Sequence, residues 1–272
     1  MLLAADAVVA GVHCDLDLVG LDDMGWKAMV ANVSDIAAVG GRPRYALVTV
    51  SGPLAQLDFD LLYDGLIAAA GAYDCPIVGG DLSSSPTLVV SVAVVGDGGT
   101  GEPRPVLRSG ARPGDTLFTT GPLGSSAAGL ELLRSGRMAD APDLVLSHRR
   151  PRARLDEGTA ARAAGATAMI DVSDGLASDV RHLANASGVG VVLDRVPVAI
   201  GVSRVSDDPE ALALGGGEAY ELLFTASDPD RVASTFADLG LGTPLRIGRC
   251  TDDPSERRLR DGDLPVLGWE HR

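Results

Sequence analysis

Strand-type apolar runs alternate with amphipathic helical segments along almost the whole of this 272-residue chain, and glycines or prolines separate them. Such an alternation restricts the chain to folds in which sheets and helices share a core, so the predicted fold class is α/β or mixed α+β, with two lobes. Asp23 is predicted to cap the first helix. Strands are predicted at 2–9, 45–50, 76–78, 87–95, 116–120, 189–193, 220–225 and 245–248 and in the run that ends at Asp171, and helices at 24–39, 57–72, 125–134, 231–239 and from Leu176 to Gly188.

Two stretches rich in turn residues divide the chain. Residues 96–105 are rich in glycine and proline, and residues 112–115 read RPGD. The chain is long enough for two modest domains. We therefore expect one domain at 1–106 and a second at 107–272, each with its own strands and helices.

The composition excludes several classes of function. A net charge of -14 repels nucleic acid and anionic membranes. No segment approaches the roughly 18 apolar residues of a membrane span. The three cysteines are widely spaced and form no CxxC pair, which is typical of reduced thiols. We expect a cytoplasmic protein whose partners are neither nucleic acid nor membrane.

Several aspartates follow one local pattern, in which a short apolar run and a glycine or small residue precede the acid. Asp35, Asp81 and the pair Asp171 and Asp174 share this pattern, and Asp6 interrupts an apolar strand. Mg²⁺ prefers oxygen ligands, usually one or two carboxylates with phosphate and water. Two bare carboxylates about 4 Å apart repel by roughly 4 kcal/mol, so convergent acids imply a bound cation or a shifted protonation. Taken singly, Asp174 is also typical of a turn or helix cap, and Asp81 of a turn.

Other candidate residues give weaker signals. Arg108 suits a phosphate clamp, and it equally suits a surface position before a turn. The loop at 121–129 is rich in glycine but lacks the Gly-Lys-Ser/Thr ending of a P-loop. The basic patch at 147–154 is interpreted as a solvated loop. The serines and the four histidines show neither hydrolase nor zinc spacing, so these two chemistries are not supported.

In combination, these segments resemble the thiamine-monophosphate kinases, within the superfamily of aminoimidazole ribonucleotide synthetase. The likeness covers almost the whole chain, and the order and spacing of its motifs are specific although each motif alone is weak. The motifs are D-x-x-V-x-G-V-H at 6–13, K-A-x-x-x-N-x-S-D-I-A-A-x-G at 27–40, GGDL at 79–82, RSGARPGD at 108–115, GPLGSSAAGL at 121–130, HRRPRAR at 148–154, IDVSDGLASD at 170–179, GGGEAYELLF at 215–224 and GWEH at 268–271.

The resemblance implies a homodimer that transfers the γ-phosphoryl group of ATP to thiamine monophosphate with the help of several Mg²⁺ ions. It implies metal ligands at Asp6, Asp35, Asp81, Asp171 and Asp174, ATP contacts at Gly80, Asp81, Arg108 and Ser173, and substrate contacts at His13, Glu218 and Trp269. No residue is assigned as a general base, because a phosphate monoester acceptor is already largely anionic at neutral pH. Metal ions that hold donor and acceptor in line suffice for such a transfer.

The sequence departs from the family pattern at a few places. It begins after a segment that carries a Gly-Asp-Asp motif in family members, and Ala4-Ala5 precede Asp6 where Ser or Thr is usual. Ala219 stands in place of an Asp, and the C-terminus reads Trp269-Glu270-His271. Two further hypotheses therefore stay open: a related ATP-dependent enzyme with a different small substrate, and a nucleotide-binding dimer without catalytic activity.

Overall fold

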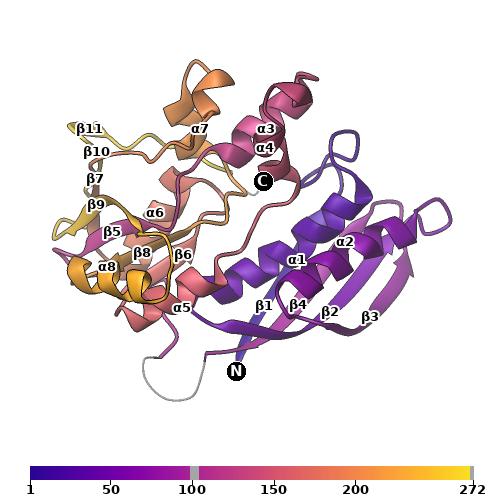
Figure 1. The fold of residues 1–272 in the computed structure, drawn as a ribbon, viewed down its shortest axis with the longest axis horizontal. Coiled ribbons are helices and arrows are strands. Elements are labelled where there is room, and N and C mark those ends of the chain that lie inside the picture. The colour runs from indigo at the N-terminus through magenta and orange to yellow at the C-terminus, as the bar shows by residue number, and fades with distance from the viewer. Residues whose placement is uncertain (99–103, 270–272) are drawn as a thin grey trace.

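The computed structural model describes residues 1–98 and 104–269, and its strands form two separate sheets flanked by helices (Figure 1). This arrangement confirms the predicted mixed α/β class. The part of the chain before residue 98 contributes β1 (Leu2–Val9), α1 (Leu21–Ala38), β2 (Arg42–Gly52), α2 (Phe59–Ala72), β3 (Ile77–Ser84) and β4 (Val89–Asp97). Glu270 and His271 of the C-terminal motif lie outside the described residues.

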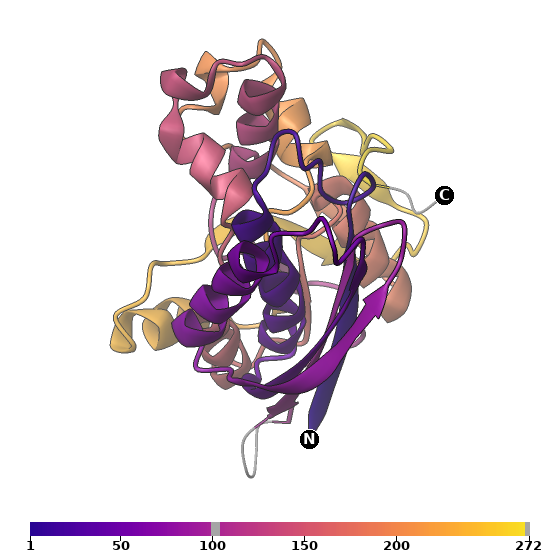
Figure 2. The same cartoon turned by 90° about the vertical axis from the view of Figure 1, so that its right-hand side faces the viewer.

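The four N-terminal strands form a sheet in the order β1-β4-β2-β3, in which only β2 and β3 run parallel. Helices α1 and α2 cover one face of this sheet (Figure 2). On that face Val48 and Val92 are buried against Leu62 and Leu66 of α2. Strand alternation therefore accounts for the helix side of the sheet.

The opposite face of the N-terminal sheet carries apolar side chains that no described residue covers. We call it the open sheet face. It includes Leu3, Tyr45 and Leu47, whose exposed fractions are 70%, 54% and 49%. Ala93 of β4 pairs with Leu47 and belongs to the same face, because directly opposed residues of neighbouring strands point to the same side.

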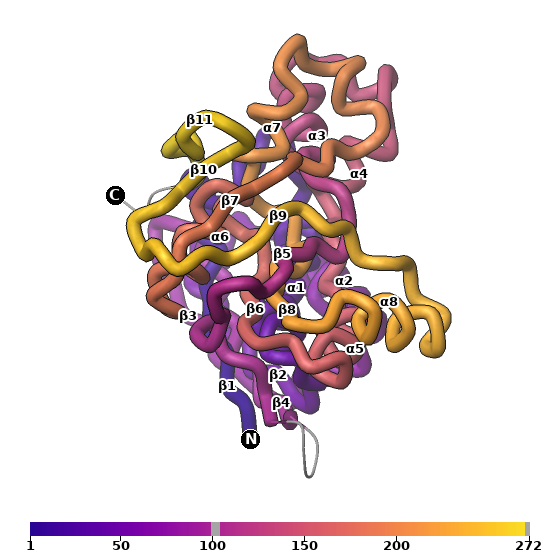
Figure 3. Tube along the Cα trace, turned by 90° about the vertical axis from the view of Figure 1, so that its left-hand side faces the viewer, coloured from indigo at the N-terminus to yellow at the C-terminus, as the bar shows by residue number. Residues whose placement is uncertain are grey.

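The C-terminal part builds a seven-stranded sheet in the order β11-β10-β7-β9-β5-β8-β6 (Figure 3). Its strands are β5 (Thr116–Thr119), β6 (Ala168–Asp171), β7 (Gly190–Leu193), β8 (Leu222–Ala226), β9 (Leu245–Thr251), β10 (Arg257–Leu259) and β11 (Gly262–Asp263). Its helices are α3 (Ser125–Arg134), α4 (Pro142–Arg149), α5 (Leu155–Ala163), α6 (Leu176–Ser187), α7 (Pro209–Gly215) and α8 (Pro229–Asp238), with short 3₁₀ turns η1 (Met138–Asp140) and η2 (Val202–Arg204).

Helix α1 joins the two parts of the molecule. Its Val33 and Ala37 belong to the same buried apolar cluster as Ala160 of α5 and Phe224 of β8. Unusually for a helix with this many buried residues, it also buries the polar side chains of Asp23, Lys27, Asn32 and Ser34. Helix α1 therefore presents polar groups to the boundary between the two sheets.

Two N-terminal predictions are wrong in detail. Helix α1 begins at Leu21, and Gly20 occupies its N-cap, so Asp23 lies in the first turn and does not cap the helix. Strand β3 does not turn at the glycine pair but continues through Asp81. A Cβ atom on Gly80 would lie 1.7 Å from the carbonyl oxygen of Val48, so this glycine permits close parallel pairing instead of a turn.

In the second half, the sequence predicts no helix where α7 lies, and it predicts neither β10 nor β11. Asp208 caps α7 and Pro209 begins it, which is a recognisable helix start in the sequence. The two added strands are only three and two residues long, so their periodicity gives no signal. None of the helices in the described ranges is both long and apolar enough to cross a membrane.

Candidate active site

Carboxylates from three elements converge at the boundary between the sheets. Asp6 of β1 pairs with the buried Val92, so it points to the helix side of its sheet, where α1 packs against β1. Asp35 lies on α1, and Asp171 ends β6, which α1 also contacts. The pKa of Asp35 rises to about 7, chiefly through burial of the carboxyl and then through the negative charges of Asp171 and Asp6. These carboxylates therefore lie within one another's electric field.

Asp171 is the most buried member of this group. Only 6% of the residue is exposed, and the Ser34 hydroxyl of α1 donates a 2.6 Å hydrogen bond to its Oδ2 atom. Burial raises the pKa of Asp171, although the hydrogen bond from Ser34 and the charge of Arg108 act in the opposite direction. An acid held in this way favours either a proton or a cation as a partner.

Asp174 extends the group towards helix α6, and its side chain does not cap that helix. The N-cap position belongs to Gly175, and Asp179 in the first turn accepts the backbone N–H groups of Asp174 and Gly175 at 3.1 and 3.0 Å. The interpretation of Asp174 as a cap is therefore wrong. Burial and the charges of Asp174 and Asp171 raise the pKa of Asp179 to about 8.

Asp179 and His182 were not among the predicted site residues. Ligand atoms of Asp174, Asp179 and His182 lie within 4.8 Å of one another. The spacing of five and three residues is visible in the sequence. It acquires meaning only because the chain turns into a helix at Gly175.

Arg108 and Ser173 lie beside the carboxylates. The positive charge of Arg108 lowers the pKa of both Asp35 and Asp171, which places its guanidinium within their reach. The preceding Leu107 carbonyl accepts the N–H of Met169 at 2.9 Å, so this segment runs alongside β6. Ser173 lies between Asp171 and Asp174 and accepts, through its carbonyl, the N–H of Glu218 at 2.7 Å. Arg108 and Ser173 therefore adjoin the acidic group.

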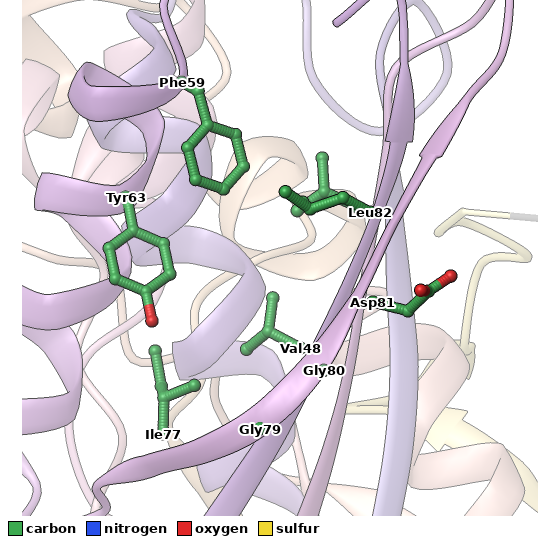
Figure 4. A pocket seen from close by; sticks show the side chains of 9 residues that line it. Val48, Phe59, Tyr63, Ile77, Gly79, Gly80, Asp81 and Leu82 are labelled. Atoms are coloured by element: carbon green, nitrogen blue, oxygen red, sulfur yellow. The ribbon is translucent and has the colours of Figure 1, made fainter.

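Asp81 is the one predicted metal ligand that lies apart from the rest. It belongs to β3, whereas Asp6 belongs to β1 at the other edge of the four-stranded sheet, about 14 Å away at the usual strand spacing. Asp81 pairs with Thr49, so its side chain points to the open sheet face, opposite to Asp6. Figure 4 shows the Asp81 carboxylate directed away from the helices. Within one chain, Asp81 does not reach the other carboxylates.

An apolar cavity of about 530 Å³ lies on the helix side of β3. Phe59 and Tyr63 of α2 stack there with ring centroids 5.6 Å apart, and Val48, Ile77 and Leu82 complete the wall (Figure 4). The backbone of Gly79 and Gly80 forms its floor, because these residues carry no side chain into it. A flat aromatic ligand fits such a wall.

The residues predicted to contact the substrate fall into two groups. The ring centroids of His13 and Trp269 lie 6.3 Å apart. The backbone N–H of Trp269 donates a 2.9 Å hydrogen bond to the Asp174 carbonyl. Trp269 is 47% exposed, so its ring can receive a ligand. The C-terminal tail is therefore fastened to the acidic motif at the start of α6.

Glu218 forms a second, more buried group. Its Oε2 atom lies 2.8 Å from Nζ of Lys27 and 3.6 Å from Nδ1 of His148. Ser126 contacts the same histidine nitrogen at 3.2 Å. Burial, with the positive charges of Lys27, Arg134 and Arg149, lowers the pKa of His148 to about 3, so the imidazole is neutral.

The basic patch at 147–154 is not a solvated loop, which corrects the sequence-based interpretation. Arg150 pairs with Asp22 at 2.5 Å and with Asp23 at 2.7 Å, and its guanidinium lies over the Trp26 ring. Arg154 pairs with the buried Glu221. The patch therefore connects α1 to the C-terminal sheet. The signal for this role in the sequence is the pair of acidic residues in the first turn of α1, which are partners for arginine.

Comparisons with known proteins identify the family to which this chain belongs. A family model described as AIR synthase related protein, N-terminal domain, matches residues 1–97, and the corresponding C-terminal domain matches residues 112–260. The thiamine-monophosphate kinase of Salmonella typhimurium is 37% identical over 99% of this chain and 85% of that protein. The kinase of Aquifex aeolicus is 36% identical over the whole of this chain and 88% of that protein. The chain belongs to the thiamine-monophosphate kinase family.

Solved structures of this kinase family have the same fold. The thiamine-monophosphate kinase of Stenotrophomonas maltophilia superposes with a TM-score of 0.86 at 34% identity, covering 97% of this chain and 86% of that one. A structure described as AaThiL complexed with AMPPCP and TMP gives a TM-score of 0.86 at 34% identity, covering 99% and 86%. The hydrogenase maturation protein HypE, at 21% identity and a TM-score of 0.77, shares the fold alone.

Two departures from the kinase family pattern have distinct surroundings here. Ala4 is 9% exposed and packs into the N-terminal core on the side of Asp6, whereas Ala5 points to the open sheet face. Ala219 packs against the core of the C-terminal domain, between Glu218 and Tyr220, which both have positive φ.

Proposed function

We propose that the protein transfers the γ-phosphoryl group of ATP to thiamine monophosphate, giving thiamine diphosphate and ADP. The observation that carries the proposal is the convergence of Asp6, Asp35, Asp171 and Asp174 at the boundary between the two domains, which we place at 1–106 and 107–272. The kinase relatives at 36–37% identity support the choice of substrate. We place the reaction in the cytoplasm, where the three buried, unpaired cysteines would stay reduced.

The converging residues fit Mg²⁺. Carboxylate oxygens are its preferred protein ligands, and the pKa of Asp35 rises to about 7 through burial and through the negative charges of Asp171 and Asp6, although Arg108 lowers it. We propose that Asp6, Asp35, Asp171 and Asp174 hold several Mg²⁺ ions. When bound, these ions would neutralise charge on the triphosphate and on the acceptor phosphate.

The protein's own residues then supply orientation. Arg108 and Ser173 are placed to hold phosphate oxygens, and Glu218 and the ring pair of His13 and Trp269 are placed to hold the acceptor. No side chain has to remove a proton, because the acceptor phosphate is already anionic at neutral pH. The charge of Asp35 is expected to change with pH near neutrality, because the pKa of this carboxyl is about 7 without a cation.

Asp81 and the cavity beside it suggest that the site is shared between two copies of the chain. In one subunit the Phe59–Tyr63 cavity and Asp81 lie at β3, on the opposite edge of the sheet from Asp6. We propose that two subunits pack their open sheet faces together in an isologous dimer, which covers Leu3, Tyr45 and Leu47. The base of ATP would then bind in the cavity of one subunit, with Gly80 and Asp81 beside its phosphates, and the phosphates would reach the carboxylates of the other.

The decisive experiment incubates the purified protein with ATP, Mg²⁺ and thiamine monophosphate and measures thiamine diphosphate. We expect product that depends on all three components, and light scattering is expected to give a dimer mass. Binding of ATP and Mg²⁺ without turnover would favour the nucleotide-binding dimer instead. Turnover only with another small acceptor would favour the related ATP-dependent enzyme.

A further inference from the structure

Lys27 is the only lysine in the chain. The other 22 of the 23 basic residues are arginines. Most of these arginines lie at least partly in solvent, whereas Lys27 is 1% exposed and ranks among the largest fully buried side chains. A chain that uses arginine everywhere else has placed its one lysine in the interior.

The position of Lys27 requires a close partner. An ammonium group loses a large hydration energy on burial unless a carboxylate compensates it. Glu218 provides that carboxylate at 2.8 Å, from a loop of the C-terminal domain, while Lys27 belongs to α1 of the N-terminal domain. The neighbouring His148 is neutral because its pKa is lowered to about 3. Lys27 therefore supplies the positive charge that faces Glu218.

Glu218 is held in a defined orientation. Its backbone has a φ of 56°, a left-handed conformation that costs energy for a residue with a side chain. The Glu218 N–H donates to the Ser173 carbonyl at 2.7 Å, and the Tyr220 N–H donates to the Val172 carbonyl at 2.9 Å, which fixes the loop on the acidic motif. Lys27 takes the Oε2 atom, and 29% of the Glu218 side chain remains exposed. One carboxylate oxygen is thus held by Lys27, while part of the side chain stays exposed to solvent.

The same helix also holds the metal-side carboxylate. Ser34 lies seven residues after Lys27, about two turns or 10 Å along α1, on the same side of the helix. Its hydroxyl donates to Asp171 at 2.6 Å. One rigid helix therefore contacts the substrate-side carboxylate with Lys27 and a carboxylate of the acidic group with Ser34.

We propose that Lys27 is a positioning residue for the phosphate acceptor, acting through Glu218; this inference rests on the proposed kinase function. A lysine serves here because its compact ammonium group fits a buried point contact, whereas the planar guanidinium of arginine needs a wider, forked site. Helix α1 then fixes the distance between the acceptor and the cations through Lys27 and Ser34.

The test compares two variants on the same helix. In Lys27→Met, the KM for thiamine monophosphate is expected to rise at least about tenfold, while kcat and the KM for ATP stay within about twofold. In the contrast variant Ser34→Ala, which loosens the metal-side carboxylate, the magnesium dependence and kcat are expected to change more than the KM for thiamine monophosphate. Circular dichroism melting establishes that both variants are folded.

A folded Lys27→Met protein with an unchanged KM for thiamine monophosphate, or with equal losses in all three constants, would overturn the positioning role. If the wild-type protein makes no thiamine diphosphate, the kinase function fails, which is a different result. Should Lys27→Met not fold, isotope-labelled lysine in the wild-type protein gives the single side-chain NMR signal of Lys27. That signal is expected to shift with thiamine monophosphate and Mg²⁺, and an unmoved signal at saturating ligand would also overturn the proposal.

Discussion

Two carboxyl groups of this site have raised pKa values. Asp35 is open to solvent on one side, yet crowding by protein atoms and by Asp171 and Asp6 raises its pKa to about 7. Asp179 is raised to about 8, mainly because it is buried. Near neutral pH, binding of Mg²⁺ is therefore expected to release protons from the protein.

The first prediction concerns the pH dependence of stability without metal. The folded protein keeps a proton on Asp35 between pH 3.8 and about 7, a window in which the unfolded chain has lost it. Asp35 therefore contributes stability at low pH that is lost as the pH rises through this window. With EDTA present, Asp35→Asn should gain stability relative to wild type between pH 5 and pH 8, measured by urea unfolding.

Magnesium provides the control for that measurement. Saturating Mg²⁺ should reverse the difference, because it stabilises the ionised wild-type carboxylate and not the amide. A constant offset between the two proteins at every pH, with and without Mg²⁺, would contradict the assignment.

At the start of helix α6, Asp179 accepts the free backbone amides and Asp174 does not. Asp179 satisfies the amides of Asp174 and Gly175, so the Asp174 side chain has no structural role at that helix end. In the octet at 169–176, Asp174 precedes a glycine and a predicted helix. The sequence alone therefore does not distinguish a capping role from a ligand role for this aspartate.

The second prediction separates these two aspartates. Asp174→Asn should lower kcat at least about 100-fold, close to 3 kcal/mol of barrier, with little change in the free energy of unfolding. Asp179→Ala should cost about 1–2 kcal/mol of stability, because two amide donors lose their acceptor. Steady-state kinetics and urea unfolding on both variants give the comparison, and a stability loss confined to Asp174→Asn would restore the capping interpretation.

Strand β3 gives the third prediction, through two neighbouring glycines. A Cβ atom at Gly80 would meet the Val48 carbonyl at 1.7 Å, whereas at Gly79 the nearest atom is a Leu47 methyl carbon at 3.3 Å. Gly80→Ala should therefore cost about 1–3 kcal/mol in the urea midpoint analysis. Gly79→Ala, the matched control, should stay within about 1 kcal/mol of wild type. Equal costs would mean that β3 does not pair as tightly as described.

Over the whole molecule, an apolar open sheet face and a site with one distant carboxylate point to the same assembly. Dimer formation would remove Leu47 and its neighbours from water, and in the proposed dimer Asp81 of one subunit contributes to the site of the other. The same contact between the two open sheet faces would then bury the apolar side chains and complete the site.

The fourth prediction tests that contact. Leu47→Asp should reduce the mass in light scattering to that of a monomer and should lower turnover with it, because a buried charge opposes packing of the two faces. Ile67→Asp is the matched control, since Ile67 is 50% exposed on α2 and Leu47 is 49% exposed on the open sheet face. A dimer that survives Leu47→Asp with full activity would place the subunit contact elsewhere.

Much of the element pattern could be predicted because it depends on local periodicity. The predicted strand at 2–9 and helix at 125–134 match β1 and α3 residue for residue. The misses have local causes as well. The glycine pair before Asp81 is typical of a turn, but here glycine lets two strands approach. The sequence does not reveal that Asp23 pairs with Arg150, because the two residues lie 127 positions apart.

The sequence by itself determined the fold class, the family motifs and the identity of the acids that carry charge, because each of these follows from residue type and spacing along the chain. Only the tertiary structure decided which acids meet. It joined Asp6, Asp35, Asp171 and Asp174, separated Asp81, gave the amides of Asp174 and Gly175 to Asp179 and buried Lys27 against Glu218. The physical reason is that charge interactions depend on distance and burial, which the packing of α1 between two sheets sets and no short stretch of sequence contains.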